Sequence, residues 1–164
     1  MQRLMETWKS YIAEIKAGRS EFKVVSFDFD ATLALQDRDY NYFGPNEPLL
    51  SLFKQFKDKG FKVYIVTSRK QENEVRKEGE ITVADFVAEH GISPDKIIFT
   101  FPHDKADTLE REGVLLHFDD DDYELIEIDQ LVDVDIHGVK VNFPDGTISE
   151  DDFLRVKQLL GETE

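Results

Sequence analysis

Two hydrophobic patterns alternate along most of the chain. Continuously apolar, β-branched runs predict buried strands over residues 23–29, 61–66, 96–99 and 114–118. Apolar residues at helical spacing predict helices between and after these strands, over residues 49–56, 83–90, 105–112 and 123–128. Strands that alternate with helices in this way are typical of βαβ units with right-handed crossovers.

The two ends of the chain follow different patterns. Apolar residues recur at helical spacing from Leu4 to Ile15 and predict an N-terminal helix. Near the other end, residues 132–136 and 139–143 alternate between apolar and polar side chains, which predicts two strands with one wet face each. Ser149 is placed to cap a last helix. We therefore expect a C-terminal β-hairpin and helix over about residues 132–160.

Together these elements predict an α/β protein with a three-layer, Rossmann-like fold. Its central sheet should be mostly parallel, with the C-terminal β-hairpin and helix added to it. No repeat, low-complexity tract or Gly/Ser linker divides the chain, so we expect a single domain over residues 1–164. Residues 36–48 are rich in Asp, Tyr, Asn and Pro and predict a flap. The spacings between the other elements leave no room for a cap domain.

Composition excludes several classes of function. The formal net charge is −15, from 20 basic and 35 acidic residues, which disfavours stable binding to duplex nucleic acid or anionic membranes. The absence of cysteine excludes disulfides, thiolate zinc sites and a cysteine nucleophile. No apolar run reaches the roughly 18 residues of a membrane span, and the charged first 18 residues lack the apolar core of a signal peptide. We expect a cytoplasmic protein.

Polar side chains follow the predicted strands at the point where each strand ends. In chain order they are Asp28, Asp30 and Thr32, then Thr67 and Ser68, then Lys105, then Asp119 and Asp120. Ligands of open parallel sheets bind at the carboxyl ends of the strands. We therefore expect these side chains to form a single site.

In this order the residues resemble the four motifs of the haloacid dehalogenase phosphatases. The matching segments cover roughly residues 22–128 and are 24–33, 63–68, 105–107 and 116–120. The resemblance implies a haloacid dehalogenase-like fold of the small, capless type. It also implies a phosphatase in which a carboxylate attacks phosphorus and carries the phosphoryl group as an acyl phosphate. The family often has glycine where Ala31 stands, and alanine suits that turn only if φ is negative.

The resemblance assigns a role to each strand-end residue. Asp28 is the nucleophile, and Asp30 is the general acid and then the general base. Asp28, the backbone carbonyl of Asp30, and Asp120 would bind Mg²⁺, with Asp119 in support. Thr67 and Lys105 would hold the phosphoryl oxygens.

Some assignments stay open or carry a plainer alternative. Thr67 is preferred to Ser68 because it comes first after the strand, and Asp119 competes with Asp120 for the metal. Substrate contacts are expected from Ser68, Arg69 and Thr32, although Arg69 could instead pair with a surface carboxylate. Further residues have the following readings: an outer-shell carboxylate for Glu124, core packing for His117, a solvated helix start for Asp121 and Asp122, and either ring stacking or packing for Tyr40, Tyr42 and Phe43.

The predicted function is a magnesium-dependent phosphomonoesterase acting on a small soluble phosphate, such as a nucleotide. Two alternatives remain: a phosphatase of nucleic-acid 3′ ends, and a non-catalytic, receiver-like module that binds phosphate and magnesium. In receivers, the phosphorylated Asp comes from a later strand than the first acidic pair, which favours the hydrolase. The expected partner is a small phosphorylated substrate, not a membrane, and a homo-oligomer would be compatible with an open site.

Overall fold

A parallel sheet forms the centre of the protein. The computed structural model describes residues 23–71 and 79–162. Five strands pair in the order β5-β4-β1-β6-β7, all parallel. Their bounds are Val24–Phe27 for β1, Lys62–Thr67 for β4, Lys96–Phe99 for β5, Val114–Asp119 for β6 and His137–Lys140 for β7. The predicted α/β fold with a parallel sheet is confirmed.

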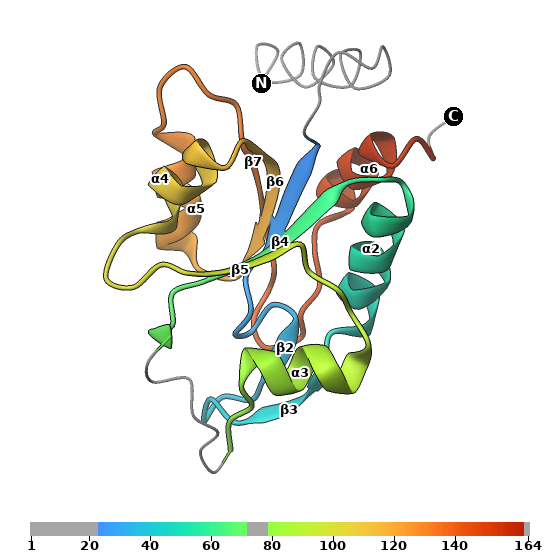
Figure 1. Cartoon of the computed structure of the whole chain (residues 1–164), viewed down its shortest axis with the longest axis vertical. Coiled ribbons are helices and arrows are strands. Elements are labelled where there is room, and N and C mark those ends of the chain that lie inside the picture. Colours follow the sequence, from blue (N-terminus) through green and yellow to red (C-terminus); the bar gives the residue numbers. More distant parts are fainter. Residues whose placement is uncertain (1–22, 72–78, 163–164) are drawn as a thin grey trace.

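Helices cover both faces of this sheet and complete three layers (Figure 1). The helices α4 (Lys105–Arg111) and α5 (Asp122–Asp129) lie on one face. The other face is covered by α2 (Glu47–Asp58) and α6 (Glu150–Leu159), while α3 (Val83–His90) lies near the carboxyl ends of the strands. Gly91 ends α3 in the left-handed conformation, and Ser149 caps α6 as predicted.

Alternation along the strands divides the core between the two faces. Val25 and Phe27 of β1 belong to the larger apolar cluster, on the side of α2, α3 and α6. Val24 belongs to the smaller cluster under α4 and α5, which includes Leu109 and Ile128. Because successive strand residues point to opposite faces, one strand supplies both layers. Phe27 also stacks on Phe118 of β6 at 4.3 Å between ring centroids, which fixes β1 beside β6.

The predicted flap is a short antiparallel hairpin. It consists of β2 (Ala34–Gln36) and β3 (Tyr42–Pro45) and leads into α2. Asn46 caps α2 by accepting a hydrogen bond from the backbone N–H of Leu49. The flap therefore ends at Asn46, two residues earlier than the boundary predicted at Pro48.

The predicted C-terminal β-hairpin is wrong. Residues 132–136 form no strand, and β7 pairs with β6 in parallel. The chain between β6 and β7 contains α5, so this segment is another βαβ unit. The wet-face alternation arises because β7 is an edge strand, with Val139 buried and Lys140 partly exposed. The predicted helix over residues 4–15 lies outside the described residues. No helix in the described ranges is long and apolar enough to cross a membrane.

Candidate active site

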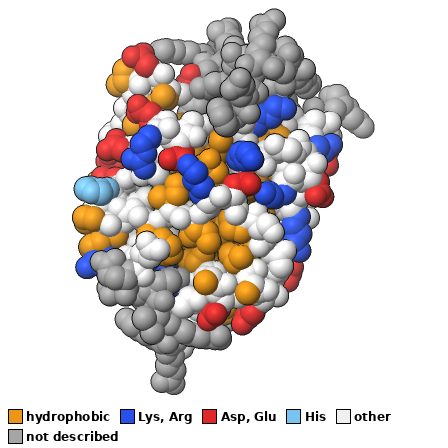
Figure 2. Space-filling view, in the orientation of Figure 1, with side chains coloured by type: hydrophobic (Ala, Val, Ile, Leu, Met, Phe, Trp, Pro, Cys, Tyr) orange, Lys and Arg blue, Asp and Glu red, His pale blue; other side chains and the backbone are white. Residues whose placement is uncertain are grey.

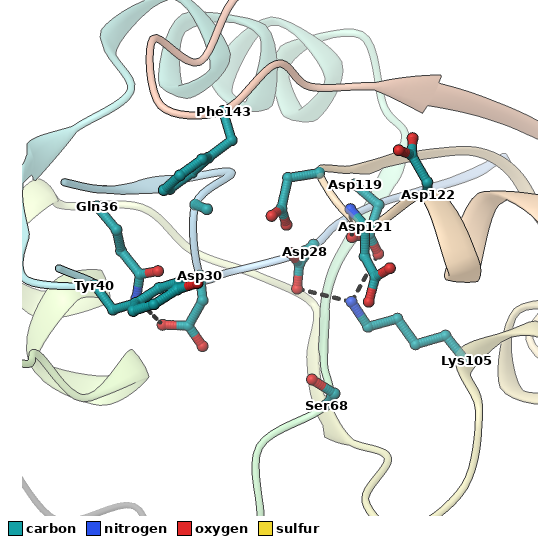
Figure 3. A pocket seen from close by; sticks show the side chains of 12 residues that line it. Asp28, Asp30, Gln36, Tyr40, Ser68, Lys105, Asp119, Asp121, Asp122 and Phe143 are labelled. Carbon is teal, nitrogen blue, oxygen red and sulfur yellow. Dashed lines mark hydrogen bonds and ion pairs between the residues drawn. The ribbon is translucent and has the colours of Figure 1, made fainter. Parts of the chain in front are cut away.

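Six of the strand-end residues, all except Thr32 and Thr67, line a cavity of about 510 Å³ at the carboxyl edge of the sheet (Figure 3). Its lining comes from the segments that follow β1 and β4, the flap, the start of α4, the end of β6 with the start of α5, and the turn after β7. The lining residues are Asp28, Asp30, Ala31, Gln36, Tyr40, Ser68, Lys105, Asp119, Asp120, Asp121, Asp122 and Phe143. Six of these are carboxylates, against one ammonium group. The cavity is therefore strongly acidic.

Asp28 occupies the centre of this arrangement. It follows β1 directly, and its backbone N–H donates to the Phe118 carbonyl of β6 at 2.8 Å, so the sheet fixes its position. Asp28 is 5 % exposed. One oxygen accepts from Lys105 Nζ at 2.7 Å, and the other from the Thr32 hydroxyl at 3.1 Å. Thr32 is completely buried, which places it behind Asp28 rather than at the cavity surface.

Lys105 forms ion pairs with two carboxylates, Asp28 after β1 and Asp119 at the end of β6. Its ammonium group lies 2.7 Å from Asp28 and 2.7 Å from Asp119, and the side chain is 2 % exposed. Burial on its own would lower the pKa of Lys105, but the two carboxylates outweigh it and raise that pKa well above its ordinary value. Lys105 is therefore a permanent cation in the described site.

Glu124 fixes the start of the helix that carries Lys105. The N-cap residue of α4, Asp104, makes no side-chain cap bond. Instead, Glu124 of α5 accepts a hydrogen bond from the Lys105 backbone N–H at 3.0 Å. Burial raises the pKa of Glu124. This carboxylate thus fixes the start of α4, and the outer-shell role expected from the sequence stays a prediction.

A buried polar chain supports Asp119. His117 Nε2 lies 2.8 Å from Asp119 Oδ2, and His117 Nδ1 lies 2.7 Å from the hydroxyl of Ser26. Burial lowers the pKa of His117. Burial would raise the pKa of Asp119, but hydrogen bonding from His117 and the charge of Lys105 hold it below its usual range. Asp119 is therefore ionised, and its oxygens are largely engaged by protein donors.

Asp120 completes a group of three carboxylates. Asp28, Asp119 and Asp120 each offer an oxygen, and these oxygens all lie within 4.8 Å of one another. Burial and the charge of Asp119 raise the pKa of Asp28 well above its ordinary value, and burial raises that of Asp120. A hard divalent cation would relieve this crowding, because carboxylate oxygens are its preferred ligands. The donor set fits Mg²⁺, with Asp120 less engaged by protein donors than Asp119.

Asp30 is held away from Asp28 by Arg69. The guanidinium binds both oxygens of Asp30, from Nε at 2.8 Å and from Nη2 at 2.7 Å. Gln36 donates to the same carboxylate at 3.2 Å. Arg69 also donates to the Ile81 carbonyl and lies over the Phe29 ring. The plainer expectation for Arg69, pairing with a carboxylate, fits this geometry, but its partner is a predicted catalytic residue.

The two hydroxyls at the end of β4, those of Thr67 and Ser68, differ in exposure. Thr67 is 1 % exposed, and its hydroxyl accepts from the Arg69 backbone N–H at 3.3 Å. Ser68 lines the cavity opposite Asp28 (Figure 3). The geometry thus favours Ser68 for direct contact with a ligand, against the preference for Thr67 drawn from the sequence.

The flap aromatics have separate roles. Tyr42 packs against Phe86 of α3, and its hydroxyl lies 3.3 Å from His90 Nε2. Phe43 is exposed and does not line the cavity. Tyr40 is 69 % exposed and does line it, facing Phe143 from the turn after β7. Packing against the body of the protein therefore explains the position of Tyr42, but not that of Tyr40 or Phe43.

Sequence reasoning missed several contributors to the site. Ser26 and Phe143 showed no motif, and His117 was expected to be a plain core residue. Lys140 of β7 donates to the Asp120 carbonyl at 2.7 Å and to Asp122 at 2.8 Å, which holds the acidic turn in place. Asp121 accepts from the Tyr123 backbone N–H as the N-cap of α5, close to its expected helix-start role. Only the parallel pairing of β7 with β6 could have revealed Lys140.

Comparison with solved structures identifies a protein of the same architecture. A probable YrbI family phosphatase from Pseudomonas syringae pv. phaseolica 1448a aligns with 99 % of this chain and 93 % of its own, at 14 % identity and a TM-score of 0.51. The chain has a haloacid dehalogenase-like fold. The resemblance stated from the four motifs is thereby confirmed for the fold.

Two further structures align less closely. A protein assigned to the HAD family of hydrolases from Streptomyces avermitilis MA-4680 aligns over 87 % of this chain and 86 % of its own, at 16 % identity and a TM-score of 0.49. A 3-deoxy-D-manno-octulosonate 8-phosphate phosphatase from Moraxella catarrhalis aligns over 64 % and 61 %, at 19 % identity and a TM-score of 0.40. No protein-family model matches the sequence, and the comparison with curated proteins gives no match.

Proposed function

We propose that the protein is a magnesium-dependent phosphomonoesterase that works through an aspartyl-phosphate intermediate on a small soluble phosphate, such as a nucleotide. The observation that carries the proposal is the setting of Asp28. This carboxylate lies at the floor of an open acidic cavity, fixed by the sheet and bound by a buried ammonium group. A rigid carboxylate beside a permanent cation is suited to nucleophilic attack on a phosphoryl group.

In the first step, an oxygen of Asp28 attacks phosphorus, and the bond from phosphorus to the leaving oxygen breaks. Protonated Asp30 gives its proton to that oxygen, and the product is an alcohol plus the acyl phosphate of Asp28. Asp30 is paired with Arg69 at the cavity wall, so this role requires its side chain to turn toward the leaving group. The side chain is 32 % exposed, which leaves room for that rotation.

In the second step, water attacks the phosphorus of the acyl phosphate while Asp30 accepts its proton. The bond from phosphorus to Asp28 breaks, so phosphate leaves and the carboxylate is restored. Lys105 stays within hydrogen-bond reach of Asp28 throughout and stabilises negative charge on the phosphoryl oxygens. Ser68 is placed to donate a further hydrogen bond from the opposite wall.

Asp28 and Asp120 would hold the magnesium ion, with Asp119 in support. When bound, the ion would supply positive charge that neutralises the phosphoryl oxygens and the crowded carboxylates. Without a cation, the cavity would repel a phosphate dianion, because six carboxylates face one ammonium group.

Phosphate release from p-nitrophenyl phosphate, glycerol phosphate and a set of mononucleotides tests the proposal. We expect magnesium-dependent turnover that falls at least about 1000-fold in Asp28→Asn, since loss of the nucleophile removes the covalent route. Asp58→Asn is the control, because Asp58 is exposed at the end of α2, away from the cavity. Turnover that is independent of magnesium, or that survives Asp28→Asn, would overturn the mechanism.

The same assay separates the alternatives left open by the sequence. A 3′-phosphorylated oligonucleotide preferred over every mononucleotide would point to a phosphatase of nucleic-acid ends. A folded protein that binds magnesium yet releases no phosphate from any substrate would point to a receiver-like module. The capless single domain and the cytoplasmic location stay predictions.

A further inference from the structure

We propose that Tyr40 and Phe143 clamp a planar aromatic ring in the leaving group, so that the preferred substrates are monophosphates of flat rings. This inference rests on the proposed phosphatase function and names its substrate class. Both side chains line the cavity that contains Asp28 and Lys105 (Figure 3). They come from segments far apart in the sequence, the flap and the turn after β7.

The relation between the two rings fits a clamp. Their centroids lie 6.3 Å apart, and their planes differ by 20°. A flat ring inserted between two others needs about 7 Å, twice the roughly 3.5 Å contact distance of carbon atoms. The rings are thus nearly parallel and would have to separate by on the order of 1 Å to admit a base or an aryl group.

The flap holds Tyr40 in a position that core packing does not explain. Tyr40 has a φ of 65°, in the left-handed region that side chains other than glycine rarely adopt. The Asp37 side chain accepts from the backbone N–H groups of Asp39 and Asn41, and the Asp37 carbonyl accepts from that of Tyr40. These bonds impose the strained conformation and leave the ring mostly exposed above the cavity. Strain imposed in this way is a feature of ligand-binding positions.

Phe143 is fixed by its own turn. Asn142 donates its backbone N–H to the Thr147 carbonyl at 2.8 Å, and Gly146 donates to the Asn142 carbonyl at 2.7 Å. Phe143 is 37 % exposed, although phenylalanine is ordinarily buried. The two partly exposed rings face each other at one side of the cavity (Figure 3), so a third ring placed between them would stack on both.

The charge of the cavity further limits the class of substrates that the site would accept. Its lining carries six carboxylates, so a leaving group with a second anionic group would be repelled. The rings themselves are neutral and recognise shape rather than charge. Uncharged heteroaromatic bases and simple aryl groups share this chemistry.

Paired substrates test the clamp. Uridine monophosphate and dihydrouridine monophosphate have the same charge and the same hydrogen-bonding groups, but only the first has a planar aromatic ring. Stacking on aromatic side chains contributes about 1–3 kcal/mol per base. We expect wild-type kcat/KM to favour uridine monophosphate by about 10-fold. Tyr40→Leu and Phe143→Leu should each reduce that preference to about 2-fold, chiefly through KM.

Phe43→Leu is the matched control, since Phe43 is an exposed flap aromatic outside the cavity lining. It should leave the preference unchanged. Phenyl phosphate is measured alongside, as a substrate with a simple aryl ring. The substrate whose kcat/KM falls further in Tyr40→Leu carries the ring that fits the clamp better. The clamp would be overturned if the wild type had equal kcat/KM on the two nucleotides. It would also be overturned if the leucine variants lost the same factor of kcat/KM on both.

Direct binding separates failure of the clamp from failure of the phosphatase. If the wild type hydrolyses neither these nucleotides nor glycerol phosphate, the proposed function has failed. Calorimetric titration of the wild type with the two nucleotides, in the presence of magnesium, then decides the clamp. Tighter binding of the planar ring, lost in Tyr40→Leu, would support it. Equal binding, or none, would overturn it.

Discussion

At the scale of single residues, the turn after Asp30 contains backbone strain. Ala31 has a φ of 59°, the left-handed conformation that glycine adopts at no steric cost. We predict that Ala31→Gly stabilises the protein by about 0.5–1 kcal/mol in urea unfolding. The gain is limited because glycine also adds freedom to the unfolded chain.

Ala34→Gly provides the control for that substitution. Ala34 is equally buried but lies in β2, outside the left-handed region. There glycine should destabilise, by about 0.5–1 kcal/mol. If Ala31→Gly destabilises as much as Ala34→Gly, the strain at Ala31 is not real.

Residue roles were predictable where chain position alone determines them. Asp28, Lys105 and Asp120 come together because the ends of parallel strands share one edge of the sheet. The hydroxyl that faces the cavity was not predictable, since Thr67 and Ser68 differ only in side-chain direction. Nor could the sequence reveal the pairing of Asp30 with Arg69, which depends on a rotamer and on the path of the flap.

At the scale of elements, α4 depends on a carboxylate from α5. Glu124 accepts from the Lys105 backbone N–H, where the helix has no side-chain cap of its own. We predict that Glu124→Ala destabilises the protein by about 1 kcal/mol, the typical effect of losing a cap. It should also lower kcat by about 10-fold, because Lys105 loses its fixed position.

Glu124→Gln keeps an acceptor oxygen for the same N–H group and should retain most of the activity. Steady-state kinetics and urea unfolding of both variants check this prediction. A Glu124→Gln variant as impaired as Glu124→Ala would show that the charge of Glu124, rather than its cap bond, supports Lys105.

Asp95 joins α2 to the sheet and should make stability depend on pH. Burial alone would raise its pKa, but the Val63 backbone N–H and the Lys57 ammonium outweigh burial and lower it. Because the folded-state pKa lies below the unfolded one, this stabilisation exists above the unfolded pKa, about 3.9. It is lost as pH falls through the folded pKa.

Asp95→Asn should therefore destabilise the protein at pH 7 by no more than about 1 kcal/mol, since the pair is near the surface. The difference from the wild type should shrink as pH falls below about 4. Asp58→Asn, an exposed change in the same helix as Lys57, provides the comparison. A deficit of Asp95→Asn that stays constant with pH would contradict the assignment.

The elements that the sequence predicted well have strong local patterns. β1, β4 and β6 have continuous apolar runs, and α3 and α6 have recognisable caps. The predicted hairpin failed because an edge strand of a parallel sheet shows the same alternation as an antiparallel one. Its true partner, β6, lies across a helix and is not visible in local sequence.

At the scale of the whole molecule, the net charge of −15 makes metal binding and stability interdependent. Asp28, Asp119 and Asp120 crowd three carboxylates into one place. Excess Mg²⁺ should therefore raise the melting temperature by about 5–10 °C, corresponding to about 2.7 kcal/mol at 100-fold saturation. Asp120→Asn should abolish most of this shift while raising the melting temperature in a chelator, because burial disfavours the charged form of Asp120.

Asp151→Asn is the control, since Asp151 is exposed in the first turn of α6. It should retain the full magnesium shift in a thermal unfolding experiment. An equal shift in Asp120→Asn would place the ion elsewhere on the acidic surface. Figure 2 shows that the face it depicts carries basic as well as acidic side chains.

The fold class was predictable because the alternation of strands and helices extends over most of the chain. Substrate selection was not, since the clamp joins Tyr40 to Phe143 through the tertiary structure alone. The selection of flat rings is therefore an inference that only the tertiary structure supports.

The most direct test of the central claim is to trap the phosphoryl group on the enzyme. Wild-type protein is mixed with magnesium and a phosphomonoester that it hydrolyses, and the reaction is quenched in acid within a single turnover. The protein is then digested, and its peptides are mapped by mass spectrometry. The account predicts one phosphoryl group on the peptide containing Asp28, and none in Asp28→Asn. Phosphate release without a phosphorylated peptide, or a phosphoryl group on another residue, would contradict it.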